Sequence, residues 1–123
     1  MKVNYDNNQP IFKQIIDKIL LDIATGELEP GSKIAPVREL ALAYNVNPNT
    51  MQKSLAKLEE MGYMFTERTS GRYVTQDTTL IESLKTKLPT QITEKYVQDM
   101  KECGIPLADI PSFVQTAIER SNS

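Results

Sequence analysis

Five side chains between residues 49 and 57 have the types and spacing to bind DNA. Asn49, Thr50 and Gln52 offer neutral hydrogen-bonding groups, and Lys53 and Lys57 add positive charge to the same segment. Amide and hydroxyl groups can read base edges in the major groove, while ammonium groups contact phosphates. A helix that carries both kinds of group is predicted to be a recognition helix.

The sequence offers little for catalysis or metal binding. It contains no histidine and a single cysteine, Cys103. It also lacks a Gly-rich phosphate loop of the Walker type and a cysteine cluster with zinc spacing, and its carboxylates are scattered over predicted helix surfaces. We therefore expect no enzyme activity, no metal site and no cofactor.

The overall charge argues against a DNA partner, but its distribution does not. The 123 residues carry a formal net charge of −2, whereas phosphate neutralisation needs clustered lysine and arginine. Residues 33–72 hold six basic and four acidic side chains, so we expect only a local basic face. The chain lacks a secretory signal and an apolar run of about 18 residues, which predicts a soluble, cytoplasmic protein without a membrane partner.

Three helices are predicted to position these side chains. Apolar residues at spacings of three and four predict a first helix over residues 10–26. A short second helix is expected over residues 37–44, and a third over residues 48–61, where Gly62 is well placed to end it. The third helix carries the candidate DNA-binding groups.

A tight turn is predicted between the second and third helices. Asn45 tolerates a left-handed backbone, Asn47 can cap the third helix through its side-chain oxygen, and Pro48 suits the first helical position. Two helices joined by such a turn form a helix-turn-helix, whose second helix enters the major groove.

A β-hairpin is expected after the third helix. Residues 63–66 and 72–75 are rich in aromatic and β-branched side chains, and residues 69–71 between them read Thr-Ser-Gly. A hairpin at this place in the chain is the wing of a winged helix-turn-helix.

The tail is predicted to be helical in three pieces. Pro89 separates the first two helices and Gly104 closes the second, and a last helix is expected between Asp109 and Arg120, with Asp109 as its candidate N-cap. A small winged domain cannot cover the apolar stripes of these helices, so we expect them to pack against a second copy of the chain. The predicted dimerisation residues are Ile81, Leu84, Leu88, Ile92, Tyr96, Met100, Val114 and Ile118.

Four motifs follow one another along the first half of the chain: PIFKQI at residues 10–15, GELEPG at 26–31, VRELA at 37–41 and VNPNT at 46–50. This series resembles the N-terminal signatures of the GntR superfamily of bacterial transcription regulators. Residues 55–63, LAKLEEMGY, also resemble the family's passage from helix to wing.

The resemblance implies a fold and a division of the chain. The fold class is mainly α with a small β-hairpin, in which residues 1–76 form a winged helix-turn-helix DNA-binding domain. Residues 77–123 form a short helical dimerisation tail, which resembles the YtrA-like branch of the superfamily.

The resemblance also implies roles for individual residues. Arg38, at the start of the second helix, would contact the DNA backbone or nearby bases. Asn49 and Thr50 would dock the recognition helix, and the wing would reach a minor groove. The full set of predicted DNA-binding residues is Lys33, Arg38, Asn47, Asn49, Thr50, Gln52, Lys53, Lys57, Arg68, Gly71 and Arg72.

The sequence departs from the family pattern in three places. Residues 34–36 read Ile-Ala-Pro where relatives commonly have Leu-Pro-Ser, and Gln52 stands where a basic residue is common. Glu67, Thr69 and Ser70 occupy wing positions often held by Arg, Gly and Lys. On the third helix, the pair of acidic residues at 59–60 is interpreted as solvent-facing.

The leading hypothesis is a homodimeric, sequence-specific transcription regulator, most simply a repressor, that binds a pseudo-palindromic DNA operator. Its half-sites would lie about one helical turn apart. The alternative is a winged-helix protein-interaction module without DNA binding, which the acidic net charge and the altered wing favour. A third interpretation, compatible with the first, is a regulator that senses a small-molecule effector at the tail.

Overall fold

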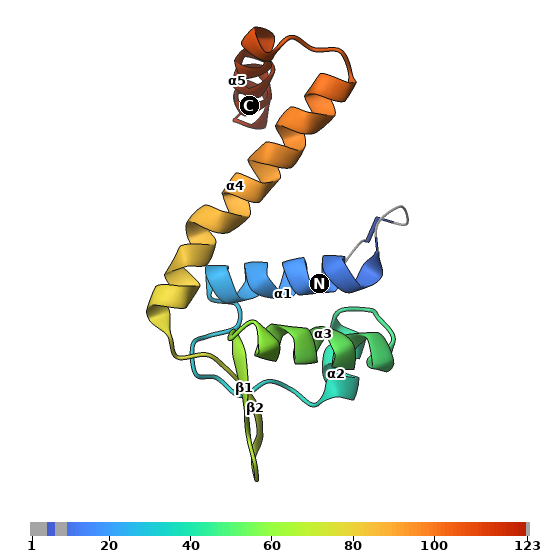
Figure 1. The fold of residues 1–123 in the computed structure, drawn as a ribbon, viewed down its shortest axis with the longest axis vertical. Helices are drawn as coiled ribbons and strands as arrows, with labels where there is room; N and C mark the ends of the chain where they lie inside the picture. The colour runs from blue at the N-terminus through green and yellow to red at the C-terminus, as the bar shows by residue number, and fades with distance from the viewer. Residues whose placement is uncertain (1–4, 7–9, 123) are drawn as a thin grey trace. The chain divides into compact units, whose positions relative to one another are not determined.

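The computed structural model describes residues 5–6 and 10–122 and confirms the predicted fold class, mainly α with one β-hairpin (Figure 1). The chain divides into two compact units, Met1–Lys85 and Thr86–Ser123. The elements in chain order are α1 (Ile11–Thr25), α2 (Val37–Ala43), α3 (Pro48–Glu60), β1 (Met64–Glu67), β2 (Gly71–Val74), α4 (Thr78–Glu102), the 3-10 turn η1 (Leu107–Asp109) and α5 (Ile110–Ser121).

Helices α1 and α3 supply much of the core of the first unit. Ile15, Ile19 and Ile23 recur every four residues along α1, so they share one face, and all three are fully buried. On α3, Leu55 and Leu58 are buried in the same way. Burial of these faces fixes which side of α3 remains exposed.

The tight turn between α2 and α3 forms as predicted. Asn45 has a left-handed backbone with φ of 55°, and Asn47 accepts a 2.7 Å hydrogen bond from the backbone N–H of Asn49 through its side-chain oxygen. Pro48 takes the first position of α3, where a missing N–H costs no helical hydrogen bond. The start of α3 is therefore fixed by local chemistry.

The wing is an antiparallel hairpin of β1 and β2, in which Thr66 lies opposite Arg72 and Phe65 opposite Tyr73. The rings of Phe65 and Tyr73 stack with their centroids 5.6 Å apart. The free edge of β2 pairs with the segment 32–34, since the backbone N–H of Ile34 donates to the carbonyl of Arg72 at 2.8 Å. This pairing anchors the wing on the side away from β1.

Helix α4 runs unbroken from Thr78 to Glu102, so the predicted break at Pro89 is wrong. An interior proline removes one backbone hydrogen bond and crowds the carbonyl four residues before it, which weakens a helix but need not end it. No glycine lies between Pro89 and Gly104 in the sequence, and the helix ends at Glu102, two residues before Gly104 with its left-handed φ of 80°. The predicted stop at Gly104 is therefore confirmed, although the tail has one long helix where two were expected.

The last helix, α5, occupies nearly the predicted span, but its predicted cap does not form. Asp109 stands at the N-cap position without a side-chain capping hydrogen bond. Its φ and ψ of −91° and −14° are helical because η1 precedes it, whereas a capping side chain requires an extended backbone. The carbonyl of Asp109 instead accepts a 2.8 Å hydrogen bond from the Ser112 hydroxyl.

Candidate nucleic-acid interface

One face of α3 presents most of the predicted recognition residues. Asn49, Gln52 and Lys53 are exposed, and Thr50 is partly buried. The neighbouring Ser54 is buried, and its hydroxyl donates a 2.8 Å hydrogen bond to the carbonyl of Thr50. Amide and ammonium groups thus share the exposed side of a helix whose other side is fixed in the core.

Lys57 lies one turn further along α3 and pairs with an acidic neighbour. Its Nζ is 3.6 Å from Oε1 of Glu60, and both side chains are largely exposed. Pairs of this kind on a helix surface contribute only about 0.3–0.5 kcal/mol. A phosphate can therefore replace Glu60 as the partner of Lys57 at small cost.

A groove of about 630 Å³ lies between the wing and the start of α2 and brings three predicted residues together. Lys33, Gly71 and Arg72 line it, and Arg38 follows directly in the exposed first turn of α2. Gly71 has a φ of 120°, and a Cβ there would lie 3.2 Å from Cε of Lys33. Only glycine fits this backbone conformation without strain, which explains its place in the wing.

The two wing arginines lie in different surroundings. Arg68 is exposed in the turn between the strands, where a wing can reach DNA. The side chain of Arg72 is only 19% exposed, and its Nε lies 3.6 Å from Oε1 of Glu59 on α3. Glu59, interpreted from the sequence as solvent-facing, is in fact in contact with the wing.

Comparison with known proteins identifies the family. The family model described as "Bacterial regulatory proteins, gntR family" matches residues 11–74. This chain belongs to the gntR family. The predicted resemblance is thus confirmed, and with it the assignment of the chain as a DNA-binding transcription regulator with a winged helix-turn-helix.

Full-length relatives extend the similarity into the tail. YhcF of Bacillus subtilis, named an HTH-type transcriptional regulator, is 33% identical, with 97% of this chain and 98% of YhcF covered. The HTH-type transcriptional repressor YtrA of the same organism is 30% identical, with 94% and 89% covered. A solved GntR family transcriptional regulator from Listeria monocytogenes is 39% identical and superposes with a TM-score of 0.78, with 91% of this chain and 98% of that chain covered. The short YtrA-like architecture of this GntR regulator is therefore shared along nearly the whole chain.

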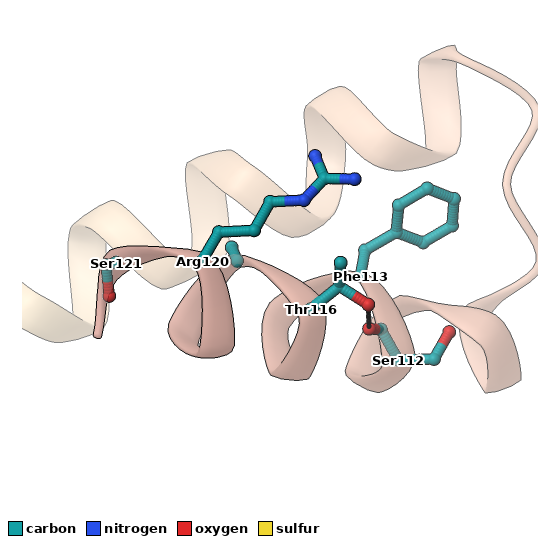
Figure 2. Close-up of a pocket in the computed structure, with 6 residues that line it drawn as sticks. Ser112, Phe113, Thr116, Arg120 and Ser121 are labelled. Atoms are coloured by element: carbon teal, nitrogen blue, oxygen red, sulfur yellow. Dashed lines mark hydrogen bonds between the residues drawn. The ribbon is translucent and has the colours of Figure 1, made fainter. Parts of the chain in front are cut away.

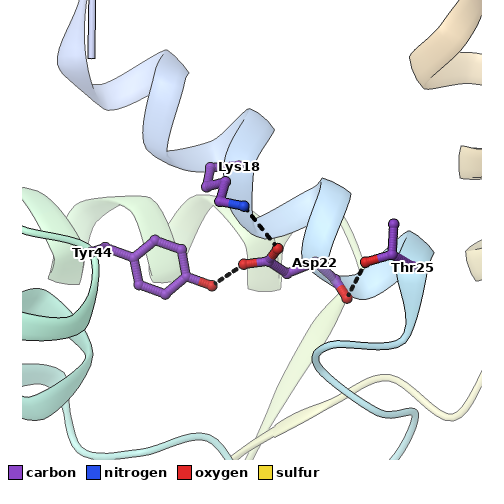
Figure 3. A network of polar contacts seen from close by, with 4 residues as sticks. All are labelled: Lys18, Asp22, Thr25 and Tyr44. Carbon is purple, nitrogen blue, oxygen red and sulfur yellow. Dashed lines mark hydrogen bonds and ion pairs between the residues drawn. The ribbon is translucent and has the colours of Figure 1, made fainter. Parts of the chain in front are cut away.

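A buried polar network that the sequence did not predict joins α1 to the end of α2 in the GntR regulator (Figure 3). The Asp22 carboxylate on α1 accepts a hydrogen bond from the Tyr44 hydroxyl and pairs with Lys18 at 3.2 Å. Burial raises the pKa of Tyr44 well above its usual value of 10.0, and the hydrogen bond to Asp22 raises it further. The sequence feature that could have revealed this network is Asp22, which lies among the isoleucines of the buried face of α1, because buried carboxylates require partners.

The predicted dimerisation residues fall into three groups in the structure. Ile81 and Leu84 are buried within the first unit, so they serve the fold of the chain itself, because the first turns of α4 belong to that unit. Ile92, Val114 and Ile118 are exposed large apolar side chains of the second unit. The remaining three, which are partly exposed, are Leu88, Tyr96 and Met100.

Helix α5 also carries a shallow hollow of about 640 Å³ (Figure 2). Phe113 and Arg120 line it together with hydroxyl groups, and the Thr116 hydroxyl donates a 3.0 Å hydrogen bond to the carbonyl of Ser112. Residues of one helix line this hollow, so it does not enclose a small molecule by itself. The predicted effector at the tail remains a prediction.

Among the described residues, no helix is long and apolar enough to cross a membrane, and no three candidate ligand side chains gather as a metal site would require.

Proposed function

We propose that this GntR-family regulator acts in the cytoplasm as a homodimer that represses transcription from a pseudo-palindromic operator, without catalytic activity of its own. The proposal assigns residues 1–76 to DNA binding and residues 77–123 to dimerisation, although Ile81 and Leu84 at the start of α4 pack in the first unit. The observation that carries it is the exposed face of α3, which holds Asn49, Gln52 and Lys53, together with the exposed Arg38 in the first turn of α2.

The proposed contacts divide into base reading and phosphate binding. Asn49 and Gln52 carry both donor and acceptor groups, as adenine recognition in the major groove requires. Arg38 in the first turn of α2 and Lys53 in the second turn of α3 supply positive charge for the phosphates. Arg68 extends the contact through the wing to the neighbouring groove.

Homodimerisation is supported by the apolar side chains that the second unit leaves exposed. Phe113, Val114 and Ile118 are each 40–49% exposed on α5, and Ile92 of α4 is 68% exposed. Large apolar side chains left exposed in this number often mark an interface. A twofold dimer would present two recognition helices to two half-sites, which explains why a small regulator needs the tail.

The direction of regulation is supported by one relative. YtrA, which aligns with 94% of this chain, is named a transcriptional repressor. A dimer bound over a promoter represses by excluding polymerase, and no further domain is needed for that role.

A salt titration tests the proposal. The full chain is titrated with a DNA fragment from upstream of its own gene and with unrelated DNA of equal length. We expect tighter binding to the upstream fragment and an affinity that falls steeply with salt, because each neutralised phosphate adds about −0.9 to the slope of log K against log salt. Equal binding to both fragments would contradict an operator in that region.

Two substitutions separate this function from the protein-interaction alternative. Arg38→Ala and Lys53→Ala should each weaken DNA binding and lower the salt slope by about one, while the circular dichroism spectrum stays unchanged. Glu39→Ala, which changes an exposed acidic side chain next to Arg38, is the matched control and should not weaken binding. A protein-interaction module would be indifferent to all three changes.

A further inference from the structure

Glu59 contacts both strands of the wing from the last turn of α3. The Thr66 hydroxyl on β1 donates a hydrogen bond to Oε1 of Glu59, and Nε of Arg72 on β2 lies 3.6 Å from the same oxygen. Thr66 and Arg72 are directly opposite each other in the hairpin, so their side chains share one face of it. One carboxylate oxygen of Glu59 thus contacts both residues of a cross-strand pair.

The environment of Arg72 makes this contact important for the wing. Its Nε is buried and has no hydrogen-bond partner among the described residues. A buried charged group is unfavourable unless an opposite charge compensates for it. Glu59 supplies that charge, because Nε of Arg72 lies close to its carboxylate on α3.

The wing depends on its neighbours for its direction. A two-stranded hairpin is at best marginally stable in water, so flanking contacts must hold it in place. The segment 32–34 pairs with β2 along one edge, and Glu59 joins both strands to the recognition helix. Arg68 in the turn of the hairpin is placed relative to α3 through these contacts.

We propose that Glu59 is a positioning residue that fixes the wing against the recognition helix, with Thr66 and Arg72 as its partners. In this arrangement Arg72 supports the wing, and phosphate contact is left to exposed residues such as Arg68. The inference rests on DNA binding by the winged unit and requires neither the proposed dimer nor repression. The inference gives the acidic Glu59 a role at an interface that binds DNA, which is itself negatively charged.

The sign of one substitution separates this role from that of a solvated residue. A glutamate that merely lies near DNA repels phosphates, so its removal should raise affinity. Removal of a glutamate that positions the wing should lower DNA affinity, although the net charge of the protein becomes less negative. Glu60 provides the matched control, because it is the next residue on α3, carries the same charge, and pairs with Lys57.

The experiment measures DNA binding of the full chain with Glu59→Ala, Glu59→Gln and Glu60→Ala. The probes are the upstream fragment and, at low salt, an unrelated duplex of equal length. We expect Glu59→Ala to weaken binding about tenfold, as the loss of a charge-assisted contact predicts. Glu59→Gln keeps an acceptor for Thr66 and should recover part of this loss, and Glu60→Ala should bind as tightly as the wild type or more tightly.

Amide hydrogen exchange gives a readout that needs no DNA. Glu59→Ala should speed amide exchange in β1 and β2 and leave α1 protected. Glu60→Ala should leave the exchange rates of the wing and of α1 as in the wild type. Combining Glu59→Ala with Arg72→Ala should weaken binding no further than Glu59→Ala alone, because both residues act through one contact.

Three results would overturn the proposal. One is DNA binding by Glu59→Ala that equals or exceeds the wild type while wing exchange is unchanged, which would make Glu59 a solvated residue. Another is a loss of protection throughout α1 and α3, which would make its role one of general stability. The last is a further fall of the salt slope by about one when Arg72→Ala is added, which would make Arg72 a phosphate contact.

Discussion

The Tyr44 hydroxyl donates a 2.6 Å hydrogen bond to the Asp22 carboxylate, and both side chains are buried (Figure 3). Tyr44 caps α2 and begins the turn that leads to the recognition helix. Its carbonyl also accepts a 2.7 Å hydrogen bond from the hydroxyl of Tyr5. One residue therefore ties α1 and the N-terminal segment to the turn of the helix-turn-helix.

Replacing Tyr44 with phenylalanine should lower the free energy of unfolding by about 1.5–3 kcal/mol, because the buried carboxylate loses a hydrogen-bond donor. Urea denaturation measures the change. Tyr73→Phe is the matched control, since its hydroxyl bonds to Ser70 at 2.8 Å on the exposed wing, and should change stability by less than about 0.5 kcal/mol. Equal stability of the two variants would show that the buried hydrogen bond contributes nothing.

The raised pKa of Tyr44 predicts a loss of stability in alkali. Below the usual pKa of 10.0, tyrosine is protonated in both states and contributes no pH dependence. Above it, the unfolded chain loses the proton and the folded chain keeps it, so stability falls with rising pH, by at most about 1.4 kcal/mol per unit for this group. Urea midpoints between about pH 9 and pH 12 should fall less steeply in Tyr44→Phe than in the wild type. Parallel curves would contradict the prediction.

The capping role of Asn47 at the start of α3 can be tested separately from its proposed contact with DNA. Asn47→Ala should cost about 1 kcal/mol of stability, because the N–H of Asn49 loses its acceptor. Asn47→Asp keeps the acceptor and should preserve stability, but its negative charge beside the backbone phosphates should weaken DNA binding. Urea denaturation and DNA titration of both variants test this. If Asn47→Asp bound DNA as the wild type does, Asn47 would lie away from the phosphates.

Local signals in the sequence were sufficient for the helix-turn-helix. The left-handed Asn45, the cap at Asn47 and the N1 proline at 48 each depend on residues within the same turn, so the sequence predicts all three correctly. The family motifs extend the prediction to the winged fold as a whole.

Features that depend on distant residues were not predictable in this way. The contact of Glu59 with Arg72 requires the hairpin to fold back onto α3, and the pattern of either segment alone contains no sign of it. Ile81 and Leu84 looked like part of a tail stripe, because periodicity does not say whether a face packs on its own chain or on another. Their burial within the first unit follows only from the tertiary fold.

The proline inside α4 should be the weakest point of that helix. Pro89→Ala restores a backbone N–H in a helix interior, where proline is about 3 kcal/mol less favourable than alanine. We expect a higher melting temperature and more helical signal by circular dichroism. Pro111→Ala is the control, because Pro111 lies in the first turn of α5, where proline is tolerated. A Pro89→Ala variant that melts like the wild type would show that α4 adapts to the proline without strain.

The apolar face of α5 predicts how the proposed dimer can be dissociated. Val114→Glu and Ile118→Glu each place a charge among side chains that are 40% and 47% exposed in the single chain. Burying such a charge in a dimer interface is costly, so light scattering at micromolar concentration should show monomers, and operator affinity should fall because two half-sites are no longer held together. Gln115→Glu adds the same charge to the same helix beside Glu119, its hydrogen-bond partner in the wild type, and should remain dimeric. Dimers that persist in Val114→Glu and Ile118→Glu would place the interface on another surface of the chain.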